Sequence, residues 1–549
     1  MKKTILTSAS VLALGIAAPA FAQSTSDIDQ DGTANGATVT QLGANTSDIE
    51  QTGDSNSAKV DQTGSLNEST IDQDSFFGLA DVKQDGDRNT STIDQDDPDT
   101  APGQAGTTGV SGFDPDATVS QTGNDNSSGI SQTIAAGGGF NQTASVTQSG
   151  DNNISNIDQD SNGPGYTGGL RAIVTQSGDA TSDIIQTGSN AGKNLNAYVT
   201  SDASTSNIIQ TASDASGQNP TAVARVNQEG GSTSNITQTL TGNLTTDLNA
   251  EVTQRDGATS NITQTAAGDE SVTQDAFVTQ DGASTSNITQ TFNNDGSNNF
   301  MATVNQAGDG NLSNITQRDE GYGIIGNADG GLIADVNQTG DGNTSNLVQE
   351  NKGAFADIDQ TGNGNDSLVF QGTAGNRLIS LQSGDDNTSN VTQGGLNNSA
   401  DVLQAGIGAS STIDQTGRND TAFVDQLVGS DGSTSLITQL GASGDRSENS
   451  ATVTQSGASN SSELTQSGFN STADVLQSGS GNRSLLAQLG TVDGLGNSAD
   501  VDQLGNDNLS DISQTGSLNS ATVTQNSDDN TSYVTQNGTG NTATVTQGN

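Results

Sequence analysis

Hydrophobic and polar positions alternate along this chain in one short phrase: a small residue, any residue, an aliphatic residue, any residue and then glutamine. The first copies place Val39, Ile49, Val60 and Ile71 at the aliphatic position. Because the fixed residues stand two apart, each phrase has the period of a strand with one buried face, which no helical stripe shares. The pattern therefore predicts short strands whose small, aliphatic and glutamine side chains point inward.

The phrase recurs about forty-two times, with Ser and Ala alternating at the small position, so that two phrases form a unit of roughly 22 residues. Between phrases, residues such as Gly43, Asn45, Gly53 and Asn56 supply the turns. A two-strand rung has too few apolar groups to fold alone, so the rungs must stack. The sequence predicts an all-β solenoid, or β-helix, of about 21 stacked two-strand rungs with amyloid-like cross-β spacing, roughly 100 Å long.

The inward side chains are expected to form aliphatic rows and glutamine ladders. Aliphatic burial alone falls short of the entropy lost on ordering, so the remainder must come from backbone ladders and from glutamine amides that bond from rung to rung. The residues assigned to the aliphatic rows are Val39, Ile49, Val60, Ile71, Val523, Val534 and Val545. Those assigned to the ladders are Gln41, Gln51, Gln62, Gln73, Gln525, Gln536 and Gln547.

This repeating unit resembles the curlin repeat of the bacterial curli subunits. Gln, Gly, Asn, Ala and Gln follow one another in the same order and spacing, here at Gln51, Gly53, Asn56, Ala58 and Gln62. The resemblance implies a secreted functional amyloid fibre subunit that serves biofilm matrix, adhesion and surface colonisation. It also implies self-polymerisation, a nucleator subunit and a dedicated outer-membrane secretion pore as partners. The chain has several times more repeats than familiar curli subunits, and no evident leader segment.

The first 22 residues have the pattern of a secretory signal peptide. Lys2 and Lys3 precede an apolar run over 11–18, and Ala20 and Ala22 frame a cleavage site. We therefore expect a mature solenoid over 23–549, exported from a bacterium with an outer membrane and located in an extracellular or cell-surface fibre. With no Cys there is no disulfide framework.

The chain is strongly acidic, with 64 Asp and Glu against 15 Lys and Arg and a formal net charge of −49. Such a charge argues against a nucleic-acid partner. Many acids flank the aliphatic residue, as Asp48 and Glu50 do, where they would repel neighbouring chains as gatekeepers. We hypothesise that salt, or divalent cations bound non-specifically, speeds assembly by screening this charge.

Loop insertions fall mostly at one corner of the predicted coil. Long stretches such as 96–116 and 318–333 separate a Ser-type strand from the following Ala-type strand, whereas the opposite corner keeps a tight spacing. Strands are also expected close to both ends of the mature chain, without caps. Open ends of this kind favour head-to-tail polymerisation.

Other functions are weaker interpretations of the same pattern. A monomeric acidic stalk or adhesin is the main alternative. The turns at 308–311 and 340–343 lack the ligand density of a calcium loop, and outward pairs such as Thr452 and Thr454, which could suit ice, lie on a face that Lys59 and Asp81 interrupt. With no His, no Cys and no acid pair outside the repeat, the sequence predicts no enzyme, cofactor or specific metal site.

Overall fold

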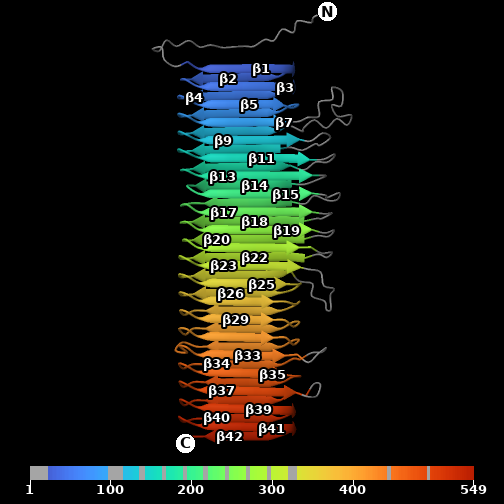
Figure 1. Ribbon diagram of the computed structural model, residues 1–549, viewed down its shortest axis with the longest axis vertical. Coiled ribbons are helices and arrows are strands. Elements are labelled where there is room, and N and C mark those ends of the chain that lie inside the picture. The colour runs from blue at the N-terminus through green and yellow to red at the C-terminus, as the bar shows by residue number, and fades with distance from the viewer. Residues whose placement is uncertain are drawn as a thin grey trace, which may run out of the picture.

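The structure, a computed structural model, describes residues 23–96, 115–134, 142–162, 169–189, 194–213, 221–241, 246–267, 272–293, 298–319, 331–441, 447–490 and 495–548. These residues form 42 strands. The strands lie across the long axis of a rod and follow one another from one end to the other (Figure 1). The expectation of an all-β parallel solenoid is confirmed. The expected signal peptide lies outside the described residues.

Strands with odd numbers form one parallel sheet and strands with even numbers form a second, each 21-stranded. The odd strands are β1 (Thr25–Thr33), β3 (Thr46–Asp54), β5 (Glu68–Asp74), β7 (Thr90–Asp96), β9 (Ser127–Ile134), β11 (Ile154–Asn162), β13 (Thr181–Ser189), β15 (Thr205–Ser213), β17 (Thr233–Thr241), β19 (Thr259–Ala267), β21 (Thr285–Phe292), β23 (Leu312–Asp319), β25 (Thr344–Glu350), β27 (Asp366–Gln371), β29 (Thr388–Gln393), β31 (Ser410–Gln415), β33 (Thr434–Leu440), β35 (Ser461–Ser467), β37 (Arg483–Gly490), β39 (Leu509–Ser517) and β41 (Thr531–Thr539).

The even strands are β2 (Gly36–Leu42), β4 (Ser57–Thr63), β6 (Leu79–Asp85), β8 (Asp116–Thr122), β10 (Gln142–Ser149), β12 (Leu170–Ser177), β14 (Asn194–Asp202), β16 (Thr221–Gln228), β18 (Thr246–Arg255), β20 (Val272–Asp281), β22 (Asn298–Ala307), β24 (Leu332–Thr339), β26 (Phe355–Thr361), β28 (Arg377–Gln382), β30 (Ser399–Gln404), β32 (Thr421–Gln426), β34 (Ser450–Gln455), β36 (Thr472–Gln477), β38 (Ser498–Gln503), β40 (Ser520–Gln525) and β42 (Thr542–Gln547). One odd strand and the next even strand make one rung.

Equivalent residues lie directly above one another from rung to rung. Ser47 pairs with Ser69, Ile49 with Ile71 and Gln51 with Gln73 where β3 meets β5. In-register stacking places identical side chains at the parallel strand spacing of about 4.8 Å, so each inward type forms a column along the rod.

Rungs are longer than the sequence analysis suggested. Within the odd-numbered sheet, 20 steps separate Gln30 from Gln536, a mean of about 25 residues a rung rather than 22. The shortest steps are 21 or 22 residues, as from Gln30 to Gln51 and from Gln51 to Gln73. The excess comes from connections between an odd strand and the next even strand, such as that between β7 and β8.

A continuous apolar core fills the space between the two sheets. Its largest members are the Ile, Leu and Val residues of the strands, and Ile71 and Val60 are both 0% exposed. The small residues beside them, such as Ala58, are also buried and allow the two sheets to approach closely.

The middle rungs contain two further clusters that the repeated phrase does not predict. Here most strands are longer, and extra inward residues stand two positions before the Ala or two after the Gln, except Val272, which stands four before Ala276. The first cluster is Leu170, Leu195, Ala212, Ala222, Leu240, Leu248 and Ala266. The second is Val272, Phe292, Phe300, Leu332 and Ala354. Phe292 and Phe300 meet edge to face, with ring centroids 6.2 Å apart.

Glycine is required where adjacent turns approach each other. Gly53 and Gly64 have φ angles of 102° and 108°, in the region that favours glycine. A Cβ on Gly64 would collide with the backbone carbonyl of Gly86 in the next rung. The glycines therefore let successive turns stack as closely as the strands do.

Candidate functional site: the side-chain ladders and the ends of the stack

In the odd-numbered sheet, the inward glutamines form a hydrogen-bonded ladder. Gln51 Nε2 donates to Gln73 Oε1 over 2.7 Å, and Gln73 Nε2 donates to Gln95 Oε1 over 2.8 Å. The other amide hydrogen of Gln73 is directed to the backbone carbonyl of Ser57, at the start of the facing strand, over 3.4 Å. Each carboxamide thus joins successive rungs and also joins the two sheets.

The even-numbered sheet has an equivalent ladder. Gln41 donates to Gln62 over 2.8 Å and Gln62 to Gln84 over 2.7 Å, while near the other end Gln525 donates to Gln547 over 2.8 Å. Ser201 interrupts this ladder, because β14 has serine at the position where its neighbours β12 and β16 have glutamine. The odd-numbered ladder continues through this region, where Gln186 donates to Gln210.

The structure places the aliphatic residues that the sequence singled out between the sheets. Exposure is 0% for Ile49, Val60, Ile71 and Val523, and 6% for Val534. The glutamines of the inner rungs are equally buried: Gln51, Gln62, Gln73 and Gln525 are 0% exposed.

End-rung residues have the same orientation but are less covered. Val39 and Gln41 in β2, and Val545 and Gln547 in β42, are only half-buried. In the described residues each of these strands has a neighbour on one side only, which leaves part of its inward side chains open.

The turn asparagines form a further ladder, which the sequence analysis treated only as turn residues. The backbone N–H of Asn67 donates to Asn45 Oδ1 over 3.0 Å, and that of Asn89 donates to Asn67 Oδ1 over 2.9 Å. Asn67 Nδ2 donates to the carbonyl of Gly86 over 2.7 Å. The repeated Asn therefore satisfies backbone groups at the corner, where strand pairing ends.

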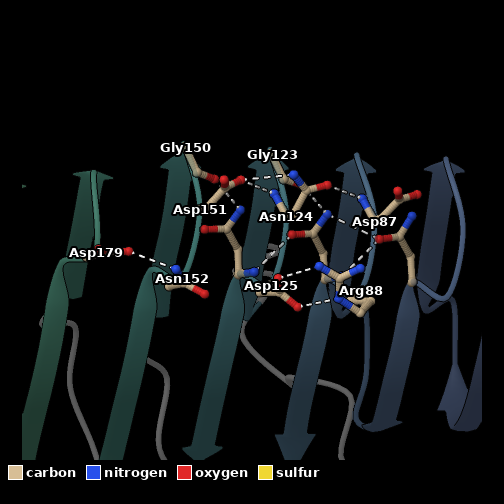
Figure 2. A network of polar contacts seen from close by, with 12 residues as sticks. Asp87, Arg88, Gly123, Asn124, Asp125, Gly150, Asp151, Asn152 and Asp179 are labelled. Carbon is tan, nitrogen blue, oxygen red and sulfur yellow. Dashed lines mark hydrogen bonds and ion pairs between the residues drawn. The ribbon is translucent and has the colours of Figure 1, made fainter.

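Acids at the turn tips are hydrogen-bond acceptors between rungs. In the row shown in Figure 2, the N–H of Asp87 donates to Asn124 Oδ1 over 3.0 Å, and the N–H of Asn124 donates to Asp151 Oδ1 over 2.7 Å. Arg88 pairs with Asp125 in the same row, with Nη2 and Oδ2 2.6 Å apart. Carboxylate oxygens at the turn tips therefore bond adjacent turns to one another.

Most inward serines of the odd strands are buried without a hydrogen bond to their hydroxyls, although Ser128 Oγ accepts one from Gln121 Nε2. Ser47, Ser69 and Ser91 are at most 1% exposed, and no described residue bonds to their Oγ atoms. A buried hydroxyl without a partner does not stabilise the fold, so these serines act through their small size.

Carboxylates on the outer face of the first rungs form in-register rows. Burial, together with the neighbouring Asp94 and Glu50, raises the pKa of Asp72 above its usual range. Burial and the nearby Asp96 do the same for Asp74. Like charges stacked at the strand spacing repel one another, so protonation of Asp72 and Asp74 favours the folded stack.

The two ends of the described stack present complementary hydrogen-bonding groups. At one end, Gln30 and Gln41 donate onward to Gln51 and Gln62, and their own Oε1 atoms accept from no glutamine of the described residues. At the other end, Gln547 Nε2 donates to the carbonyl of Thr531, with no further glutamine beyond it in the described chain. One end therefore presents ladder acceptors and the other presents ladder donors.

The end strands of the described stack also have unpaired backbone edges and exposed apolar side chains. Within residues 23–548, β1 pairs with β3 and β42 pairs with β40, each along one edge. Ile28 of β1 is 39% exposed, although Ile49, which occupies the same column, is fully buried. An unpaired strand edge beside exposed apolar side chains is a surface that can template another strand.

Two other kinds of site are absent from the described part of the chain. It contains no group of three or more acidic residues placed to hold a metal ion. It also contains no helix long and apolar enough to cross a membrane. The ladders and the two ends are therefore the features from which a function can be argued.

Comparison with known protein families finds the Curlin associated repeat in five segments of the chain, at residues 44–74, 384–417, 447–477, 493–516 and 516–548. The first of these segments contains β3 to β5 and the last contains β40 to β42. No match to a curated protein was found.

Proposed function

Since this chain is built with Curlin associated repeats near both ends of its stack, we propose that it is a structural subunit that assembles into extracellular curli-like fibres. The repeat belongs to a structural family of extracellular fibres, and no catalytic activity is proposed. In such fibres the chain would serve biofilm matrix, adhesion and surface colonisation.

The observation that supports this proposal is the complementarity of the two ends. Gln536 and Gln547 present amide donors at one end, and Gln30 and Gln41 present amide oxygens at the other. When β1 and β2 of one copy lie on β41 and β42 of another, both ladders continue through the junction at the same spacing as within a chain.

Such a junction also removes exposed apolar and backbone groups from water. It would cover Ile28 and Val39 of one copy with Val534 and Val545 of the other, and it would pair the free strand edges. Since only the first and last rungs take part, the product remains open at both ends and can grow further.

The proposed partners follow from the family. A copy of the same chain is the main partner, with a nucleator subunit and a dedicated outer-membrane secretion pore as further ones. The signal peptide proposed for residues 1–22 would bring the chain to the secretion pathway.

Electron microscopy over time tests the proposal. The chain from Gln23 is diluted out of denaturant and imaged by negative stain, with and without sonicated fibres as seeds. We expect fibres that lengthen with time and seeds that shorten the lag. Separate rods of roughly 100 Å that never lengthen would contradict the proposal and favour a monomeric stalk or adhesin.

A further inference from the structure

The outer face of the odd-numbered sheet has one stretch without charge, formed by β15, β17, β19 and β21. We call this stretch the threonine face. Its outward residues include Thr233, Asn235, Thr237 and Thr239 of β17 and the residues that pair with them in β15, β19 and β21, among which Ile209 is the apolar one.

The threonine face is ordered as a lattice. Thr237 pairs in register with Thr263, and Thr263 with Thr289. Between the threonine columns, Asn235 donates to Asn261 and Asn261 donates to Asn287, both over 2.8 Å. Because threonine is stiff at χ1 and the asparagine amides already bond to one another, little side-chain freedom is left to lose on binding.

This sheet face carries charge on both sides of the stretch, and β13, the strand next to β15, has the outward Asp183. On one side, β1, β3, β5 and β7 have outward acids such as Asp72 and Asp94. On the other side, β23 has Arg318 and β25 has Glu350.

The opposite sheet is charged in the same rungs. Its outward residues there include Arg225 in β16, Glu251 in β18 and Asp275 in β20. In a chain with a net charge of −49, two rods that approach side by side repel each other least where both present the threonine face.

We propose that the threonine face is a lateral interface that packs against the same face of a second copy in a neighbouring fibre. Threonine methyl groups and asparagine ladders are suited to the dry, interdigitated contact between paired cross-β sheets. The asparagine amides retain their bonds along the ladder, so their burial leaves few polar groups without partners.

The area of the threonine face indicates whether isolated chains or only fibres can pair through it. Four strands at ~4.8 Å, with seven residues at ~3.3 Å each, cover about 440 Å² per copy, or about 900 Å² for a pair. Stable interfaces bury about 1,200–2,000 Å² in total. Isolated chains should therefore not pair through this face, whereas fibres that repeat it once per subunit should pair by multivalency. This step rests on the proposed fibre function.

The test is a triple substitution, Thr237→Asp, Thr263→Asp and Thr289→Asp. Folding should be retained, because Asp72 and Asp94 occupy the same column of the sheet in β5 and β7. The matched control places three Asp residues on the opposite sheet, through Thr253→Asp, Thr279→Asp and Asn305→Asp, which also form one column.

Fibre length and the fraction of fibres in lateral pairs are both measured by electron microscopy. We expect the wild type and the control to pair, and the threonine-face variant to elongate at the wild-type rate while its paired fraction falls at least five-fold. Equal pairing of all three, equal loss in the control, or wild-type fibres that stay single would overturn the interface while leaving the fibre function intact. Absence of elongation in the wild type would instead overturn the fibre function and, with it, this interface.

Discussion

Gln51 donates its side-chain amide to Gln73 over 2.7 Å, and both carboxamides are 0% exposed. The same contact recurs along most of the rod, where it joins each rung to the next among buried side chains. Because the donor of one rung meets the acceptor of the following rung, the ladder has a direction. This direction distinguishes the two ends of the stack and underlies the proposed assembly.

Replacing Gln73 with leucine should weaken the local stack. The change leaves the Gln51 amide, Gln95 Oε1 and a facing carbonyl without their partner, and each buried unpaired group costs about 1–3 kcal/mol. We expect the free energy of local opening at β3, β5 and β7, measured by amide hydrogen exchange, to fall by at least about 3 kcal/mol. The control Thr70→Leu changes an outward residue of the same strand. Equal protection in both variants would refute the ladder's role.

Ser69→Ala tests the opposite expectation at a neighbouring buried position. The Ser69 hydroxyl is fully buried and has no hydrogen-bond partner among the described residues, so its removal relieves a desolvation cost and loses no bond. Exchange protection of β5 should be unchanged or higher. A loss above about 1 kcal/mol would mean that the hydroxyl makes a stabilising bond.

Phe300→Ala should destabilise the middle rungs. Phe300 is 1% exposed and packs edge to face on Phe292, and a buried Phe→Ala change typically costs about 3–5 kcal/mol. Hydrogen exchange should accelerate at β20 to β24 and remain unchanged at distant rungs. The control Phe370→Ala removes a 37% exposed ring from the outer face of β27 and should have a much smaller effect. Similar losses in the two variants would argue against the second cluster as a source of stability.

Asp420 should make the rod less stable as pH rises. It is fully buried in the column that has Asn398 before it and Asn449 after it, and burial raises its pKa above the usual range. The folded state therefore holds the proton more tightly than the unfolded state. This contribution is fully present below the unfolded pKa and is lost as pH rises through the folded pKa. Asp420→Asn should increase stability at neutral pH and change it little in acid.

Asp54 supplies the control of opposite sign. Hydrogen bonds from the Thr33 hydroxyl and N–H lower the pKa of Asp54, so its contribution is present above the unfolded pKa and is lost as pH falls through the folded pKa. Asp54→Asn should reduce the stability measured at neutral pH. The two variants are compared by exchange protection from neutral pH to about pH 4. Changes of the same sign at neutral pH would contradict these assignments.

The fold could be predicted because one local signal repeats. The alternation at Ser47, Ile49 and Gln51 specifies a strand and its inward face, and its recurrence specifies parallel stacking in register. The mean rung length differed from the length expected from the sequence because the connections after the odd strands vary in length. The length of a loop does not follow from a strand pattern.

The turn and middle-rung contacts could not be derived in the same way. Asp87 and Asp151 take part in the row of hydrogen bonds between turn tips only because stacking aligns turns that are distant in sequence. Phe292 and Phe300 lie outside the repeated phrase, in strands whose extra length the pattern does not mark. Ser201 replaces glutamine in the even-numbered ladder. This exception can be found in the sequence only when it is known that Ser201 lies in register with Gln176.

End-specific blocking tests head-to-tail assembly most directly. One variant has Ile28→Asp and Val39→Asp in the first rung, and the other has Val545→Asp in the last rung. Each new carboxylate is reached by water in a free chain but would be buried without a partner in a junction. Thr38→Asp and Thr544→Asp, outward in the same rungs, serve as controls.

The decisive measurement is the mass distribution of the two blocked variants, alone and mixed, by analytical ultracentrifugation. Our account predicts that each variant alone stays monomeric and that the equimolar mixture forms dimers and nothing larger, because one intact first rung meets one intact last rung. Fibres formed by either variant alone, or a mixture that stays monomeric while both control variants polymerise, would contradict assembly through these two ends.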